Sequence, residues 1–376
     1  MNRYSRLPAL FLLTVSLMIS GVSHASDTQT VPEFSEAPET LEMNYSDPEE
    51  FCPEDRESWR PQQEVLGVEM QADPQCDPDN PEVVAAVTRG TNNVPGETLM
   101  ETGLSEDAVK KGEDLDGDGD PDVINITLEV AELNGMNPST GSLAAKHEIA
   151  PGINPGYWVF APKTRGMATE GSAASDLIRA PSPAIRAEEG DRINLKLENT
   201  HYMPHTIHFH GVDHPFVDSE GKGNDGVPYT SEKPVMPGES RTYEMTPEQA
   251  GTMFYHCHVQ PSSHVLMGLN GMFVIEEERD NNTVQTFNIG NGKVRNPSKA
   301  VSEEYDQEYD LLYQGIDKEM HSIINRSNDP RVLSRMLNRE YDVTERDPEY
   351  YTLNGKSFPY TVRESQIVVE EGDRVK

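Results

Sequence analysis

Two short histidine-rich segments constrain the fold of this 376-residue chain more than any other feature. Residues 203–211 read Met-Pro-His-Thr-Ile-His-Phe-His-Gly, and residues 254–264 contain His-Cys-His followed, after five residues, by another histidine. The β-branched and aromatic residues of both segments are typical of strands, in which successive side chains point to opposite faces. We therefore expect a fold that brings the two segments together as strands, with ligand side chains on both faces.

The alternation predicts a metal site built around a thiolate. Cys257 points to one face of its strand, and by the same parity His205 points away from the other histidines of its segment. After a loop, His264 can converge on the same point inside the domain. Two imidazoles and one thiolate with a weak or absent axial ligand are the signature of blue, type 1 copper.

The four remaining histidines of these segments share the opposite face and predict a second site made only of imidazoles. They are His208, His210, His256 and His258. Because His256 and His258 flank Cys257, the peptide chain itself gives a short electron path between the two sites. The other histidines have no partner spacing, and we take them as surface or structural residues. They include His147, His201, His214 and His321.

The region from residue 123 to 279 has the pattern of an all-β domain. Short apolar runs alternate with Gly and Pro turns, and their number and spacing suit a Greek-key β-sandwich. The expected strands are 123–133, 157–161, 184–187, 192–198, 206–210, 240–245, 252–258 and 271–276.

The two motifs resemble the copper motifs of multicopper oxidases such as laccases, and region 123–279 is similar to their plastocyanin-like, cupredoxin domains. The resemblance implies an oxidoreductase that takes electrons from a reducing substrate at type 1 copper. The Cys-His path then carries them to a trinuclear cluster, which reduces O2 to water. The implied roles are type 1 copper for His205, Cys257 and His264, type 2 for His208, and type 3 for His210, His256 and His258.

Two positions depart from the family's pattern. Five residues, 259–263, separate the His-Cys-His motif from the next histidine, where the family usually has three. The axial position, five residues after His264, is Leu269 rather than methionine, and Met267 is nearby but out of register. Leucine cannot ligate, so we expect the loss of the thioether to raise the redox potential.

Two alternatives remain open. A copper nitrite reductase shares the run at 264–271, but it normally has an aspartate where this chain has His208, and no histidine at the position of His258. A blue-copper electron-transfer protein without oxidase activity would need only the type 1 ligands. The reducing substrate is also open, since phenols, Cu(I), Mn(II) and Fe(II) all remain candidates.

An internal repeat indicates the start of a second cupredoxin domain. The Glu-Glu-Gly-Asp-Arg run of 188–192 recurs at 370–374, and residues 354–359 resemble the family's usual domain entry. We expect a linker at 280–302 and the N-terminal part of a truncated domain at 303–376, with a helical insertion near 329–341. The missing trinuclear ligands would follow Lys376, and the complete protein would form a homo-oligomer, expected to be a trimer.

The N-terminal end and the composition indicate an exported, acidic protein. Residues 1–25 read as a signal peptide, which implies a periplasmic or secreted protein without a membrane span. Residues 26–122 read as an irregular, partly disordered acidic extension, in which Cys52 and Cys76 form a disulfide or stay as free thiols. The net charge of −34 argues against nucleic acid as a partner and favours a strongly hydrated surface.

A second metal motif ends this extension. Asp114, Asp116, Asp118 and Asp122 have the spacing of a calcium loop. A strand-like run follows them in place of the helix of an EF-hand. The alternative is a solvated acidic turn.

Overall fold

The computed structural model describes residues 62–70, 82–89, 95–135, 145–165, 177–212, 215–299, 302, 304–324, 329–365 and 367–376. The predicted signal peptide, the Cys52–Cys76 pair and His214 lie outside these residues. The described residues belong to one compact unit, which extends from Ser46 to Lys376. Within them, no helix is long and apolar enough to cross a bilayer.

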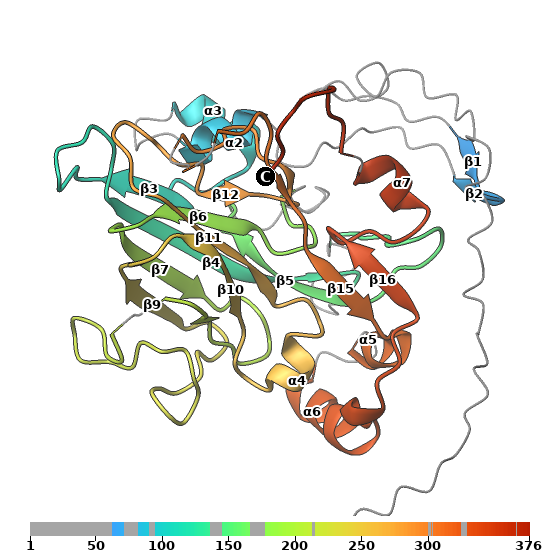
Figure 1. Cartoon of the computed structure of the whole chain (residues 1–376). Coiled ribbons are helices and arrows are strands. Elements are labelled where there is room, and N and C mark those ends of the chain that lie inside the picture. Colours follow the sequence, from blue (N-terminus) through green and yellow to red (C-terminus); the bar gives the residue numbers. More distant parts are fainter. Residues whose placement is uncertain are drawn as a thin grey trace, which may run out of the picture. The chain divides into compact units, whose positions relative to one another are not determined.

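Two five-stranded sheets form the centre of the fold (Figure 1). The first has the order β3-β4-β7-β9, with β5 also paired to β4, and the second has the order β12-β6-β11-β10-β8. The strands of the first are β3 (Val109–Gly112), β4 (Val123–Leu133), β5 (Tyr157–Pro162), β7 (Arg192–Glu198) and β9 (Ser240–Met245). Those of the second are β6 (Ala184–Glu188), β8 (His208–Phe209), β10 (Gly251–His256), β11 (Asn270–Glu276) and β12 (Phe287–Asn288).

The apolar faces of the two sheets make one core. On β7 the buried positions alternate with partly exposed ones, so Ile193, Leu195 and Leu197 all point inward. They belong to the same cluster as Ile185 and Phe273 of the second sheet. Parallel pairings join β4 to β7 and β6 to β11, and the other pairings are antiparallel. The prediction of an all-β sandwich is confirmed.

The strands that carry the histidines are shorter than expected. β8 contains only two residues, and β10 ends at His256, which pairs with His208. The backbone turns away after His210 because Gly211 has a φ of 71°. Cys257 and His258 therefore follow the strand rather than lying within it, although the Cys257 N–H still donates to the Leu269 carbonyl at 3.0 Å.

The sequence pattern predicts that the sandwich begins at residue 123. In the structure it begins earlier in the chain. β3 pairs with β4, and Leu104 and Ala108 are buried in the main core together with Val84. The sequence does not mark these residues as part of the core, because the surrounding segment is acidic and has weak hydrophobic periodicity. The other elements of this part are β1 (Gln63–Val65), β2 (Val68–Met70), α2 (Glu82–Arg89) and α3 (Gly96–Thr102).

The C-terminal part packs on the same core. A helix is confirmed near the expected insertion, and Asp329 caps it by accepting a hydrogen bond from the Arg331 N–H at 2.9 Å. Met320, Ile323 and Leu333 join the main cluster. The elements are β13 (Gly292–Lys293), β14 (Tyr309–Asp310), β15 (Tyr313–Ile316), α5 (Lys318–Ile324), α6 (Pro330–Arg339), η1 (Val343–Glu345), β16 (Tyr350–Leu353) and α7 (Tyr360–Glu364).

Candidate metal centre

Three separate parts of the chain converge at one end of the sandwich. His205 lies in the loop before β8, where its backbone N–H and carbonyl both bond to Val235. Cys257 follows the end of β10, and His264 is the last residue of the short helix α4 (Pro261–His264). The extra residues of the 259–263 loop are thus folded into a helical turn, with proline at its start, where no N–H is needed.

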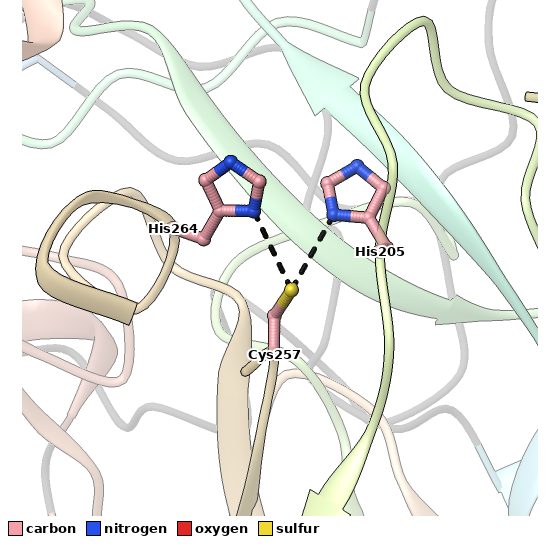
Figure 2. Close-up of side chains that lie close together, drawn as sticks. All are labelled: His205, Cys257 and His264. Atoms are coloured by element: carbon pink, nitrogen blue, oxygen red, sulfur yellow. Dashed lines mark hydrogen bonds between the residues drawn. The ribbon is translucent and has the colours of Figure 1, made fainter. Parts of the chain in front are cut away.

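The three side chains point to one buried position (Figure 2). The Cys257 sulfur lies 3.5 Å from Nδ1 of His205 and 3.4 Å from Nδ1 of His264. All three residues are 0% exposed. A metal about 2.3 Å from sulfur and about 2.0 Å from nitrogen would hold those atoms about 3.5 Å apart at tetrahedral angles and about 3.7 Å apart at trigonal angles. The donor atoms therefore already have the spacing of ligands to a shared metal ion.

The burial of these groups sets their charge. Burial lowers the pKa of His264 to about 3 and raises the pKa of the Cys257 thiol to about 12. The pKa of His205 falls well below its usual value, chiefly through burial and then through the neighbouring imidazoles. Both imidazoles are consequently neutral ligands at physiological pH, and a metal ion must displace the thiol proton in order to bind.

The donor set favours copper over structural zinc. Within the described part of the chain, no fourth histidine, cysteine or carboxylate joins the group of His205, Cys257 and His264. Structural zinc sites almost always have four protein ligands, whereas two imidazoles and one thiolate in a trigonal arrangement are typical of blue copper. Leu269 and Met267, the two residues near the axial position in sequence, are both fully buried in the same core.

The second predicted group is more exposed than the first. His256 is buried, His208 and His258 are partly exposed, and His210 is exposed. The Nε2 atoms of His210 and His256 are 2.9 Å apart. Ring centroids lie 5.6 Å apart between His208 and His256, and 5.4 Å apart between His208 and His258. The four rings thus adjoin one another, but they do not converge on one point as the thiolate group does.

Backbone carbonyls orient two of these rings. Nδ1 of His208 lies 2.6 Å from the Asp225 carbonyl, and Nδ1 of His256 lies 2.9 Å from the Cys257 carbonyl. A proton on each Nδ1 donates to the carbonyl, so each Nε2 carries the lone pair with which the ring can bind a metal. Burial also lowers the pKa of His256 to about 4, so its ring stays neutral.

His201 adjoins the buried group, although its place in the sequence indicates only a surface or structural residue. It is 6% exposed, and its Nδ1 lies 2.8 Å from Nε2 of His205. The ring of Trp158 packs edge-on against His201 and His264, with centroids 4.8 Å and 5.1 Å away. The one signal in the sequence was the separation of four residues between His201 and His205, which is weak outside a helix.

The acidic loop brings its carboxylates together as two overlapping groups. One group is Asp114, Asp116 and Asp122, and the other is Asp116, Asp118 and Glu278. Hydrogen bonds within the loop stabilise its conformation, because the Asp122 carboxylate accepts from the Leu115 and Asp116 N–H groups. Glu278 comes from a distant part of the chain, so spacing could not reveal it. Its pKa is raised to about 7, by burial first and then by Asp118 and Asp116.

Residues 178–280, which contain both histidine segments, match the model of the multicopper oxidase family. This segment is therefore similar to a domain of multicopper oxidases. The match includes all of the buried thiolate group and all four imidazoles of the second group. The matched segment supplies strands to both five-stranded sheets, in agreement with the all-β sandwich that the sequence predicts.

Curated relatives match the same part of the chain. The multicopper oxidase CTB12 of Cercospora beticola is 38% identical over 93 residues, which are 25% of this chain and 14% of that protein. Iron transport multicopper oxidase FET3 of Candida glabrata is 36% identical over 103 residues, 27% of this chain and 15% of that protein. Laccase-2 of Trametes versicolor is 35% identical over 106 residues, which are 27% of this chain and 19% of that protein. The chain therefore spans less than a fifth of the length of these relatives.

Solved structures give more distant likenesses. A multicopper oxidase crystal structure is 22% identical with a TM-score of 0.39, and the match covers 71% of this chain and 67% of that one. A copper nitrite reductase from Nitrosomonas europaea is 17% identical with a TM-score of 0.40, covering 67% and 65%.

Proposed function

We propose that this chain is the copper-binding part of a multicopper oxidase, which couples oxidation of a small reducing substrate to the reduction of O2 to water. His205, Cys257 and His264 would hold type 1 copper. The supporting observation is that the buried thiol sulfur of Cys257 lies 3.4–3.5 Å from two imidazole nitrogens. Cys257 also directly follows His256, which belongs to the imidazole group.

The four imidazoles would form half of a trinuclear copper site, with His208 at type 2 copper and the other three at type 3. Such a cluster normally needs eight histidines, so a second cupredoxin domain would supply the rest, in the same polypeptide or in another subunit. Copper, when bound, supplies one-electron redox chemistry and a binding site for O2. The protein supplies neutral ligands, excludes water from the thiolate, and fixes the rings of His208 and His256 through backbone carbonyls.

The placement of the imidazoles favours an oxidase over a simple electron carrier. A blue-copper carrier needs only the buried thiolate group, and it would leave unexplained why His208, His210, His256 and His258 adjoin on one side. A nitrite reductase needs fewer imidazoles than these four. We propose a phenol or a metal ion as the reducing substrate, export to the periplasm or the medium, and a homo-oligomer.

Copper loading tests the type 1 assignment directly. The purified chain, titrated with Cu(II) under oxidising conditions, should develop a strong thiolate-to-copper absorption band at roughly 600 nm. Cys257→Ser should abolish the band, whereas His210→Gln, which changes only the imidazole group, should leave it in place. A copper-loaded chain that stays colourless would overturn the assignment.

We also propose that the acidic loop binds Ca2+. The support is the convergence of carboxylates, because Asp116 is shared by both groups and Glu278 adds a further oxygen ligand. Hard divalent cations such as Ca2+ prefer several carboxylate oxygens. The bound ion would join the loop before β4 to the segment that follows β11.

A further inference from the structure

We infer that His201 is a positioning residue for the proposed type 1 copper. It accepts a hydrogen bond from Nε2–H of His205, and it thereby holds the His205 ring with Nδ1 toward Cys257 and makes that nitrogen a stronger donor. This inference rests on the proposed function, because it assigns a role toward a metal held by His205, Cys257 and His264.

The local backbone places the two rings in contact. Asn199, which is 1% exposed, donates from Nδ2 to the carbonyls of Met203 and Val235, both at 2.8 Å. Its side-chain oxygen accepts from the His201 N–H at 3.0 Å. The loop from 199 to 205 is therefore closed on itself, and Nδ1 of His201 lies 2.8 Å from Nε2 of His205.

The position of the His205 proton decides the direction of this bond. A neutral imidazole carries one proton. With the proton on Nδ1, it would face the Cys257 sulfur and block metal binding there. With the proton on Nε2, Nδ1 is free to bind the metal, and Nε2–H donates to His201. The hydrogen bond to His201 thus favours the tautomer that a copper ligand requires, as partners of ligating histidines generally do.

The bonding of His201 differs from that of the other buried histidines outside the ligand set. Nε2 of His147 bonds to the Gly355 carbonyl at 2.8 Å, and Nδ1 of His321 bonds to the Gly156 carbonyl at 2.5 Å. Those two rings join backbone segments. The other nitrogen of His201, Nε2, is buried with no hydrogen-bond partner among the described residues. Burying a polar ring is costly, and here the compensating side-chain bond goes to a proposed ligand.

Paired variants of the full chain test this role. His201→Leu removes the acceptor, His201→Gln keeps one, and His147→Gln alters a buried histidine that bonds only to backbone. Cu(II) affinity is measured by chelator competition, together with the thiolate band and the reduction potential. We expect His201→Leu to weaken Cu(II) binding about 10–100-fold and to raise the potential, since a weaker donor stabilises Cu(II) less. His201→Gln should recover most of the affinity, and His147→Gln should match the parent.

The outcomes distinguish a failure of the role proposed for His201 from a failure of the proposed copper function. If the parent is blue but His201→Leu keeps its affinity and potential, or weakens no more than His147→Gln, the inference is wrong while the proposed function stands. If the parent shows no thiolate band, both fail.

A measurement on the unmutated chain keeps the inference testable if His201→Leu does not fold. Nitrogen-15 NMR of histidine-labelled protein loaded with Cu(I) should show His205 protonated at Nε2 and His201 unprotonated at Nδ1. A proton on Nδ1 of His201 would overturn the inference.

Discussion

Nδ1 of His264 lies 3.4 Å from the sulfur of Cys257 because helix α4 folds the intervening residues into a single turn. The longer loop therefore does not move His264 away from the thiol. The buried site accepts a loop of this length because Pro261 starts the helix and Ser263 and His264 face inward.

Copper affinity should rise with pH. Without metal, burial raises the pKa of Cys257 to about 12, so binding a metal releases one proton from the thiol. The pKa of His264 is about 3, and that of His205 lies well below its usual value, so neither imidazole releases a proton at neutral pH. The apparent affinity should consequently increase about tenfold per pH unit between roughly pH 6 and pH 9. Chelator competition at several pH values measures this slope, and a flat profile would contradict a buried protonated thiol.

Leu269→Met should lower the type 1 reduction potential. If Leu269 occupies the axial position, a thioether there would stabilise Cu(II) relative to the parent site. Leucine and methionine have similar volumes, so the exchange should cost less than about 1.5 kcal/mol of stability. Redox titration of the loaded protein gives the potential. Met267→Leu is the matched control, and a change in potential in that variant instead would place Met267 at the axial position.

Calcium should raise the melting temperature of chelator-treated protein. Binding only to the folded state stabilises it by mass action, by about 2.7 kcal/mol at 100 times the dissociation constant. Asp116→Asn should remove most of this effect, because Asp116 belongs to both carboxylate groups. Thermal unfolding with and without millimolar Ca2+ provides the measurement. If the parent melts at the same temperature in both, the loop is a solvated turn.

Arg186→Met should strongly destabilise the domain. Arg186 is buried and binds both oxygens of Asp310, at 2.7 Å and 2.5 Å, with Glu308 at 3.2 Å. Removing the cation takes its Arg186 partner from the buried Asp310 carboxylate, and breaking a buried ion pair in this way typically costs about 3–5 kcal/mol. Denaturant unfolding monitors the loss. Lys222→Met, which removes an exposed ion pair with Glu220, should change stability little. If both variants lowered the free energy of unfolding equally, the buried ion pairs of Arg186 would contribute no more to stability than an exposed pair.

The sequence predicted those parts of the fold in which local pattern and tertiary packing agree. The strands at 123–133, 192–198 and 240–245 have the expected bounds, because alternation there reflects a half-buried sheet. At 206–210 the alternation of histidines instead reflects ligand positions, and only His208 and Phe209 are in a strand. The contribution of Val84 and Leu104 to the core came from tertiary packing that no local periodicity indicated.

Sequence alone could predict only those residues of the candidate site that stand in short motifs. His205, Cys257 and His264 stand in motifs, and the structure brings them together. His201 could not be recognised, because its contact with His205 depends on the hydrogen bonds of Asn199 in an irregular loop. Glu278 could not be recognised either, since it reaches the acidic loop only through the fold.

Cys257 is fully buried, whereas His256 beside it belongs to the more open imidazole group. Neighbouring Cα atoms are held about 3.8 Å apart by covalent bonds. The covalent chain therefore fixes how far apart the backbones of Cys257 and His256 lie, whatever the packing around them. A change in the length of the 259–263 turn would leave that backbone distance unaltered. Insertion or deletion of a single residue at 256–258 would change it at once.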